Sequence, residues 1–242
     1  MRVFDTHLHI VDVRFPLVPN QGYLPESFTV DDYRARFDAA GGAVVSGSFQ
    51  AYDQTYLVDA LTRLGPTFVG VAQVPPAITD AEVLALRDAG VRAFRANLHR
   101  GTAPPDLARM ATRLDALAGW HLEVYGDPRT LPPGLNAERL VIDHLGMTAD
   151  ALPALLALVE RGTRVKATRF GALDFDVAAV MRAIVAVNPA ALLFGTDLPG
   201  TRAPRAFEPR DLELVAEIGG TGALWDNAAA VYLPDGPRDP AG

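Results

Sequence analysis

The stretch Phe4-Asp5-Thr6-His7-Leu8-His9-Ile10 combines an apolar, strand-prone run with two histidines. Side chains two positions apart in a strand point to the same face, so we expect His7 and His9 to lie side by side. Paired imidazoles suit a metal ion or a polarised carbonyl oxygen. A plain polar strand edge is the alternative, but the nearby Asp5 and Asp12 favour a functional site.

The pattern of a short apolar run, a loop and a segment with helical periodicity recurs along the chain. We expect eight strands, at residues 3–10, 43–50, 67–74, 91–99, 120–126, 140–146, 164–170 and 192–198. Helices are expected at residues 29–40, 54–64, 80–89, 105–118, 149–161, 174–187 and 210–218. Residues 128–139 have the composition of a loop or one short turn, and residues 223–233 that of a closing helix.

Strands that alternate with helices predict an α/β fold with a parallel sheet. Eight such units predict a closed, distorted (β/α)₈ TIM barrel. The alternative is an open, Rossmann-like sheet, but no G-x-G-x-x-G follows the first strand. We therefore expect a single barrel domain over residues 1–233 and a loose C-terminal tail over residues 234–242.

Composition narrows the class of protein. The chain has 242 residues, no cysteine and a formal net charge of −7, so disulfides, thiolate ligands and a cysteine nucleophile are excluded. It has no basic run, no signal-like start and no apolar stretch that approaches the length of a membrane span. We expect a cytoplasmic protein that acts on a small molecule and binds neither nucleic acid nor membrane. The sequence does not indicate an oligomeric state.

Polar residues gather where the expected strands end. The active site of a parallel barrel lies at the carboxyl ends of its strands. The runs carry there the residues His7, His9, Arg95, Asn97, His99, Tyr125, His144, Lys166, Arg169 and Asp197. Any one of them could simply cap a loop. Three histidines and an aspartate at the same end of the barrel together predict a functional site.

Seven stretches now carry a resemblance to a known family. In chain order they are FDTHLHI, VRAFRANL, GWHLEVY, LVIDHLGM, TRVKATRFG, LLFGTDLP and WDNAAAVY. The chain resembles the amidohydrolase superfamily, specifically the amidohydrolase 2 family and its branch of 2-pyrone-4,6-dicarboxylate lactonases and related enzymes. The resemblance implies a distorted (β/α)₈ barrel and hydrolysis of a cyclic ester, a lactone.

The resemblance also implies residue roles. His7 and His9 match the histidine pair of the first strand, His144 the histidine of the sixth strand, and Asp197 the aspartate that acts as general base. Arg95, Tyr125 and Arg169 stand where the branch holds substrate carboxylates, and we assign Asn97 to substrate binding with them. Arg100 is a further candidate.

Departures from the family pattern bear on the metal. Binuclear members need a carboxylated lysine on a middle strand, but the only lysine here, Lys166, lies in the seventh run, so a binuclear site is not expected. His121 begins the fifth run, which favours a structural role over a ligand role. After Asp197 the branch commonly reads Trp-Pro-His, whereas this chain reads Leu198-Pro199-Gly200.

Two states of the site therefore stay open. His7, His9 and Asp197 could hold a single divalent metal, most plausibly zinc, with His144 as a fourth ligand or a substrate contact. Alternatively the site works without metal, as in the dicarboxylate lactonase type, and this reading is favoured.

The expected mechanism has Asp197 activating water while His7, His9 and His144, or the metal they hold, polarise the carbonyl. Arg95 could instead pair with an acid such as Glu123, and Lys166 could reach substrate or neutralise buried carboxylates. Two other functions are considered. One is a metal-dependent decarboxylase of a small unsaturated or aromatic acid, and the other is a non-catalytic barrel that binds a small acid.

Overall fold

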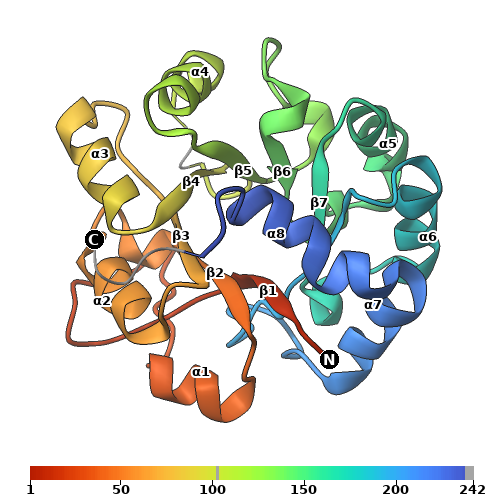
Figure 1. Cartoon of the computed structure of the whole chain (residues 1–242), viewed down its shortest axis with the longest axis horizontal. Helices are drawn as coiled ribbons and strands as arrows, with labels where there is room; N and C mark the ends of the chain where they lie inside the picture. The colour runs from red at the N-terminus through yellow and green to blue at the C-terminus, as the bar shows by residue number, and fades with distance from the viewer. Residues whose placement is uncertain (102–103, 238–242) are drawn as a thin grey trace.

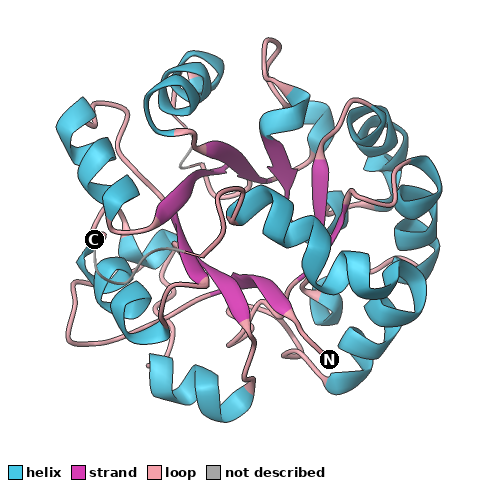
Figure 2. Cartoon of the chain, viewed as in Figure 1, coloured by secondary structure: helices cyan, strands magenta, loops and turns pink. Residues whose placement is uncertain are grey.

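A computed structural model describes residues 1–101 and 104–237, which form an inner ring of strands with helices outside it (Figures 1 and 2). All eight strands are parallel and each pairs with the next along the chain. They are β1 (Phe4–Leu8), β2 (Gly41–Val45), β3 (Phe68–Ala72), β4 (Val91–Asn97), β5 (His121–Tyr125), β6 (Leu140–Ile142), β7 (Arg164–Ala167) and β8 (Leu192–Phe194). The (β/α)₈ barrel predicted from the sequence is confirmed.

The helices pack their apolar faces against the outside of this ring. They are α1 (Val30–Arg36), α2 (Thr55–Leu64), α3 (Asp80–Asp88), α4 (Leu107–Ala118), α5 (Leu152–Glu160), α6 (Val177–Val187) and α7 (Pro209–Thr221). Local sequence sets their ends. Thr29 and Thr79 begin α1 and α3 with capping boxes, and Gly119 ends α4 in a left-handed conformation.

The observed strands are shorter than the predicted runs. β2 starts two residues early, at Gly41, and stops at Val45, and the predicted run ends in the 3₁₀ turn Ser48–Gln50. A backbone that leaves the sheet in this way can point its side chains over the end of the barrel. Between β5 and β6 the chain makes two 3₁₀ turns, Pro128–Thr130 and Ala137–Arg139, in place of a helix.

The barrel closes between β1 and β8 through a few specific bonds. The Asp197 N–H donates to the His7 carbonyl over 2.7 Å, and the His9 N–H donates to the Leu198 carbonyl over 2.8 Å. Asp5 strengthens the seam because its carboxylate accepts from both the N–H and the hydroxyl of Thr196, at 2.8 and 2.7 Å. The seam therefore fixes the backbone of the first strand's histidines relative to Asp197.

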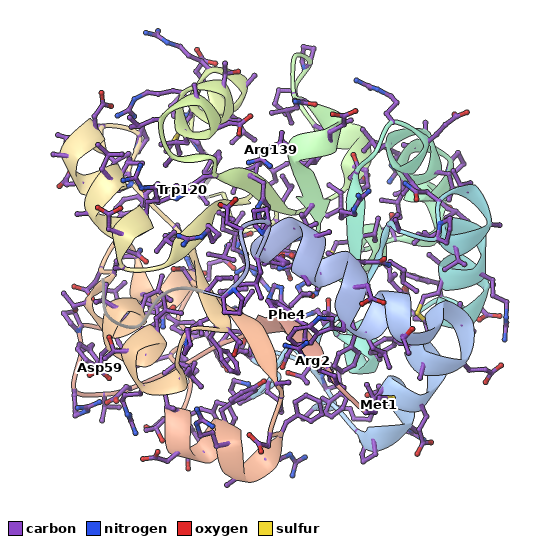
Figure 3. The ribbon with its side chains drawn as sticks, viewed as in Figure 1. Met1, Arg2, Phe4, Asp59, Trp120 and Arg139 are labelled. Carbon is purple, nitrogen blue, oxygen red and sulfur yellow. The ribbon has the colours of Figure 1, made fainter. Side chains whose placement is uncertain are left out.

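The last helix covers the end of the barrel at which the strands begin. The predicted closing helix is a π turn, Gly222–Asp226, followed by α8 (Asn227–Tyr232), which lies across the ring in Figure 1. Phe4, labelled in Figure 3, stacks on Tyr232 with ring centroids 5.4 Å apart. Because Phe4 begins β1, α8 covers the amino ends of the strands, and the carboxyl ends stay open for a site.

The predicted tail, residues 234–242, lies partly outside the described residues. Within residues 1–101 and 104–237, no helix has the length and hydrophobicity that crossing a bilayer requires.

Candidate active site

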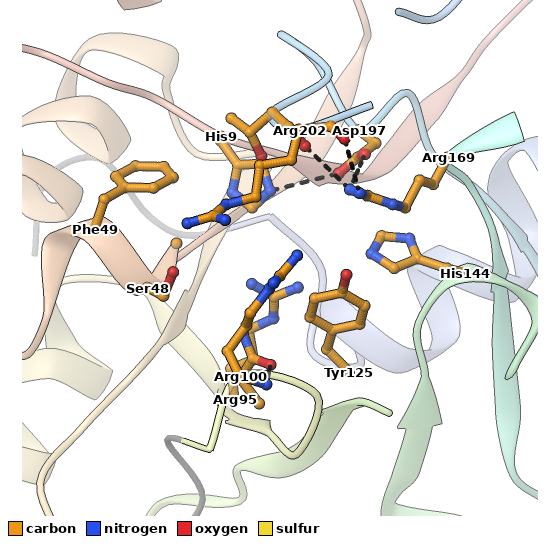
Figure 4. A pocket seen from close by; sticks show the side chains of 13 residues that line it. His9, Ser48, Phe49, Arg95, Arg100, Tyr125, His144, Arg169, Asp197 and Arg202 are labelled. Carbon is orange, nitrogen blue, oxygen red and sulfur yellow. Dashed lines mark hydrogen bonds and ion pairs between the residues drawn. The ribbon is translucent and has the colours of Figure 1, made fainter. Parts of the chain in front are cut away.

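A pocket opens at the carboxyl ends of the strands (Figure 4). Its lining comes from the last residues of β4 and β5 and from the segments that follow β1, β2, β4, β6, β7 and β8: His9, Gly47, Ser48, Phe49, Arg95, Asn97, Arg100, Tyr125, His144, Arg169, Asp197, Thr201 and Arg202. Of the residues predicted at the strand ends, His7, His99 and Lys166 do not line the pocket, and His7 and Lys166 are fully buried.

Four lining residues have a left-handed backbone that is uncommon for residues other than glycine. The φ angles are +53° at His144, +61° at Arg169, +57° at Asp197 and +58° at Arg202. Such conformations cost free energy and persist only where the surroundings impose them, and they concentrate at functional sites. Their coincidence around one pocket supports a functional role for these side chains.

Asp197 lies at the floor of the pocket and is almost fully buried. One carboxylate oxygen, Oδ2, lies 3.5 Å from Nη1 of Arg169. The other, Oδ1, has no hydrogen-bond donor among the described residues and lies 3.5 Å from His9 Nε2 and 3.6 Å from His7 Nε2. Burial alone would raise the pKa of Asp197, but His9, His144 and His7 together hold this pKa well below its usual range. Asp197 is therefore an ionised base with one oxygen available.

His9 has a defined tautomer. Its Nδ1–H donates to the Val45 carbonyl oxygen over 2.7 Å. In the neutral ring Nε2 carries a lone pair, and in the imidazolium it carries a second N–H, 3.5 Å from Asp197 Oδ1. The lone pair can accept a hydrogen bond from water or bind a metal, whereas only the imidazolium can donate to a carbonyl oxygen. The predicted donation from His9 to the substrate therefore requires the charged ring.

His7 lies between two possible partners. Its Nδ1 is 3.4 Å from the ammonium of Lys166 and 3.3 Å from Oδ1 of Asp143. Since an ammonium can only donate, the Lys166 contact leaves the imidazole proton on Nε2, which faces the pocket. A proton on Nδ1 facing Asp143 instead leaves a lone pair on Nε2. Burial lowers the pKa of His7 to about 4, an effect that Asp143 opposes and Lys166 reinforces, so the ring is neutral at pH 7.

A buried ionic cluster supports the floor from below. Lys166, fully buried, lies 2.5 Å from Glu123 and 3.6 Å from Asp143. The other oxygen of Glu123 accepts from the Tyr232 hydroxyl over 2.5 Å and lies 3.3 Å from His121. Each charge thus has an opposite partner, as buried ions require. Of the two roles considered for Lys166, the geometry favours neutralising carboxylates, and His121 lies at the far end of the cluster.

The donor set was tested against a metal ion. One ligand atom from each of His7, His144 and Asp197 lies within 4.8 Å of the other two. His7 Nε2 and Asp197 Oδ1 have no hydrogen-bond partner among the described residues and lie 3.6 Å apart. Nitrogen and carboxylate donors of this kind fit one divalent ion such as zinc. Ligand atoms of a second group, His7, Glu123 and Asp143, also lie within 4.8 Å of one another. There the ammonium of Lys166 already supplies the positive charge.

The guanidinium of Arg95 is hydrogen-bonded to groups inside the barrel. Its Nη2 donates to Asp143 over 2.9 Å and its Nη1 donates to the Ser46 carbonyl over 2.9 Å. The buried pairing considered from the sequence is present, but with Asp143 in place of Glu123. Asn97 is also engaged, since its Oδ1 accepts from the Arg100 N–H over 2.9 Å. Arg95 therefore reaches the pocket wall with much of its hydrogen-bonding capacity used.

Sequence reasoning did not identify several contributors. Ser48 and Phe49 were placed inside a predicted strand, although the preceding Gly47 was a signal that the strand ends. Asp143 immediately precedes His144 and was assigned no role. Thr168, whose hydroxyl lies 2.7 Å from His144 Nδ1, and Arg202 carried no recognisable signal.

Solved structures of other proteins match this chain over most of its length, and a curated protein matches part of its sequence. A 2-pyrone-4,6-dicarboxylate hydrolase of Comamonas testosteroni is 32% identical over 156 residues, 59% of this chain and 51% of the relative. The chain thus spans about half the length of this curated relative. An Agrobacterium tumefaciens apo structure matches with a TM-score of 0.81 at 21% identity, covering 96% of each chain.

A second structure shows the same fold. It is described as a probable 2-pyrone-4,6-dicarboxylic acid hydrolase of Acinetobacter baumannii with citric acid bound, and it matches with a TM-score of 0.78 at 18% identity over 96% of this chain and 99% of that one. The Amidohydro_2 family model, described as amidohydrolase, matches residues 4–233. The protein therefore belongs to the amidohydrolase 2 family of the amidohydrolase superfamily.

Proposed function

We propose that this protein hydrolyses a small lactone that bears a carboxylate. The observation that carries the proposal is the free Oδ1 of Asp197, an ionised oxygen at the pocket floor beside imidazole nitrogens and a guanidinium. Lactone hydrolysis needs a base for water, a donor for the oxyanion and an acid for the leaving oxygen. The named activity of the curated relative, a pyrone dicarboxylate hydrolase, is the same reaction class.

Each residue of the site has its own role in the proposed reaction. Asp197 takes a proton from water as the water oxygen bonds to the carbonyl carbon. The Nε2 atom of His9 accepts a hydrogen bond from the other O–H of the same water. His144 and the Nε2–H tautomer of His7 donate to the carbonyl oxygen as it becomes negative. The ring carbon–oxygen bond then breaks, and Asp197 returns its proton to the leaving oxygen. Arg169 and Tyr125 are placed to hold a substrate carboxylate on the side of His144 (Figure 4).

The same floor would hold one divalent metal through His7, His144 and Asp197, with His9 Nε2 facing them. When bound, such an ion polarises a carbonyl and lowers the pKa of water. The Asp143-facing tautomer of His7 is the one this state requires. We propose a site of at most one ion, because Lys166 lies within the only other group of suitable ligands among the described residues.

The test is proton release from a panel of lactones with and without carboxylates, using chelator-treated protein and then the same protein with zinc added. We expect turnover of carboxylate-bearing lactones and little with neutral ones. Turnover only after zinc is added would assign His7, His144 and Asp197 as ligands. Absence of turnover in both conditions would reject the lactonase proposal, and carbon dioxide release from unsaturated or aromatic acids would then support the decarboxylase reading.

A further inference from the structure

Lys166 is the only lysine of the chain, and its side chain is fully buried without lining the pocket. Its ammonium lies 2.5 Å from Glu123 Oε2, 3.4 Å from His7 Nδ1 and 3.6 Å from Asp143 Oδ1. The contact with Glu123 is sufficient to balance the buried positive charge. The contact with an imidazole nitrogen adds nothing to that balance, so it needs a separate explanation.

The surroundings of Nδ1 decide where His7 carries its proton. Asp143 Oδ1 lies 3.3 Å from this nitrogen, yet among the described residues this oxygen has no hydrogen-bond partner. An N–H on Nδ1 therefore does not point at the carboxylate, although the two atoms are close. The Lys166 ammonium, in contrast, is within hydrogen-bond distance of Nδ1. Because an ammonium only donates, Nδ1 must be the acceptor in this contact.

The other ring nitrogen favours the same tautomer. Nε2 of His7 has no hydrogen-bond partner among the described residues, and it lies 3.6 Å from the carboxylate oxygen Oδ1 of Asp197. A proton on Nε2 thus faces an anion, whereas a proton on Nδ1 would face an ammonium. A metal ion binds a lone pair, so it could use Nε2 only after the proton had moved to Nδ1. That move would break the contact with Lys166.

We propose that Lys166 is a positioning residue that fixes His7 as its Nε2–H tautomer, so that the pocket floor donates a hydrogen bond and binds a divalent ion weakly. This role rests on the proposed function, in which His7 donates to the substrate carbonyl. Lys166 touches neither the substrate nor the reacting atoms and acts only through His7. It selects the metal-free state from the two states that the ligand distances alone allow.

A purely structural role predicts something different. If Lys166 only balances Glu123 and Asp143, its replacement should lower stability and leave the tautomer of His7 unchanged. Removing a positive charge would also strengthen the binding of any cation nearby, so the test must keep the net charge constant. The paired variant Glu123→Gln/Lys166→Met does so, because it removes one charge of each sign. Glu123→Gln alone is the matched control, since it disturbs the same cluster but leaves Lys166 beside His7.

The first experiment is nitrogen-15 NMR of the histidine rings in chelator-treated protein at pH 7. The signals of His7 are identified by their loss in His7→Gln. We expect the proton on Nε2 in the wild type and in Glu123→Gln, and on Nδ1 in the paired variant. The wild-type spectrum alone is decisive if the paired variant does not fold. A proton on Nδ1 in the wild type, or on Nε2 in the paired variant, would overturn the proposal.

The second experiment measures zinc affinity by competition with a chromophoric chelator. We expect the paired variant to bind zinc about 10-fold or more tightly than the wild type, the size of effect that residues behind metal ligands have. Adding Asp197→Asn to the paired variant should abolish this gain, because Asp197 is one of the candidate ligands. Unchanged zinc affinity, or a gain that survives Asp197→Asn, would contradict the proposed role.

Neither experiment needs a substrate, so the role of Lys166 and the lactonase proposal can fail separately. The expected tautomer and the expected gain in zinc affinity, without turnover of any lactone, would keep Lys166 as the residue that positions His7 and reject the lactonase. Turnover of a lactone by chelator-treated protein whose His7 carries its proton on Nδ1 would keep the lactonase and reject the role of Lys166.

Discussion

Asp197 is the residue whose environment bears most directly on catalysis. Its Oδ1 has no donor among the described residues, its pKa is held low by three imidazoles, and a seam hydrogen bond fixes its backbone. These are separate physical constraints, and only a base or a ligand needs all of them. The sequence predicted the position because an aspartate ends the last strand. It could not predict that one oxygen stays free.

Replacing Asp197 with asparagine tests the base directly. The amide is nearly the same size but cannot take a proton from water, so we expect turnover of a lactone substrate to fall by roughly 10²-fold or more. Steady-state rates measure this, with thermal midpoints as a check on folding. Asp174→Asn is the matched control because Asp174 is exposed and does not line the pocket. Asp197→Asn turnover within a few-fold of wild type would remove Asp197 from the mechanism.

At the scale of elements, the seam between β1 and β8 places the reacting groups. Gly195, just after β8, lies close to His7 of β1. A Cβ built there would lie 2.7 Å from Thr168 Cγ2 and 2.9 Å from the His7 backbone nitrogen. Thr168 contacts His144, so crowding at this point reaches two of the three rim histidines.

The substitution Gly195→Ala should therefore disturb both stability and activity. Overpacking of this kind costs about 1–3 kcal/mol, and moving His7 or His144 should lower kcat. Gly222→Ala is the control, since Gly222 has a helical φ of −55° and the nearest atom to its Cβ would be 3.5 Å away. Urea denaturation and rate measurements on both variants decide the matter. Equal behaviour of the two variants would show that the seam tolerates movement.

The closing helix α8 contributes to the site from the opposite end. Its Tyr232 donates to Glu123, which holds Lys166, which in turn contacts His7. A helix at the amino ends of the strands is thus linked to the floor of a pocket at the carboxyl ends. All of these side chains are fully buried, so the chain of contacts lies inside the barrel.

The substitution Tyr232→Phe should show how much the hydrogen bond to Glu123 contributes to the free energy of unfolding. Removing the hydroxyl leaves one Glu123 oxygen with only His121, and an underbonded buried carboxylate costs about 1–3 kcal/mol. We expect a lower free energy of unfolding in urea by that amount. Tyr52→Phe is the control, because Tyr52 is exposed. Identical unfolding curves for the two variants would show that Glu123 does not need the bond.

The helices, strands and turns differ in how well the sequence pattern predicted them. Alternation of apolar runs with helical segments was enough for the barrel, because each run is buried on both faces and leaves a clear signal. Residues at strand ends followed from the same pattern. Arg202 and Ser48 did not, because their positions depend on turns whose φ and ψ angles are set by long-range contacts. Arg95 was ambiguous because its choice of Asp143 depends on strand register, which periodicity does not fix.

The whole molecule is acidic, yet its pocket is basic. The formal net charge is −7, whereas Arg95, Arg100, Arg169 and Arg202 all line one cavity. Like charges gathered in a cleft focus the field and attract an anionic ligand, and this attraction weakens as salt is added. The net negative charge of the whole chain opposes the long-range part of this attraction. Selectivity for anions therefore depends on the contacts inside the pocket.

Buried neutral histidines make the stability of the whole molecule depend on pH. Burial lowers the pKa values of His7, His121 and His144, that of His7 from 6.5 to about 4. Below pH 6.5 the unfolded chain therefore binds protons that the folded protein does not, and stability falls as the pH is lowered. At pH 5 the effect of His7 alone is about 2 kcal/mol, at 1.36 kcal/mol per pKa unit.

Asp5 acts in the opposite direction. Burial raises its pKa to about 6, against the opposing effect of its hydrogen bonds with Thr196, so the folded protein binds a proton before the unfolded chain does. Between pH 7 and pH 5 this opposes the loss from His7 by about 1 kcal/mol. His121 and His144 add to the loss, so the free energy of unfolding should fall by more than about 1 kcal/mol over this range. Urea denaturation of chelator-treated protein at pH 7, 6 and 5 measures it. A constant or rising free energy would mean that these histidines are already protonated in the folded protein, which would conflict with the neutral His7 that the mechanism requires.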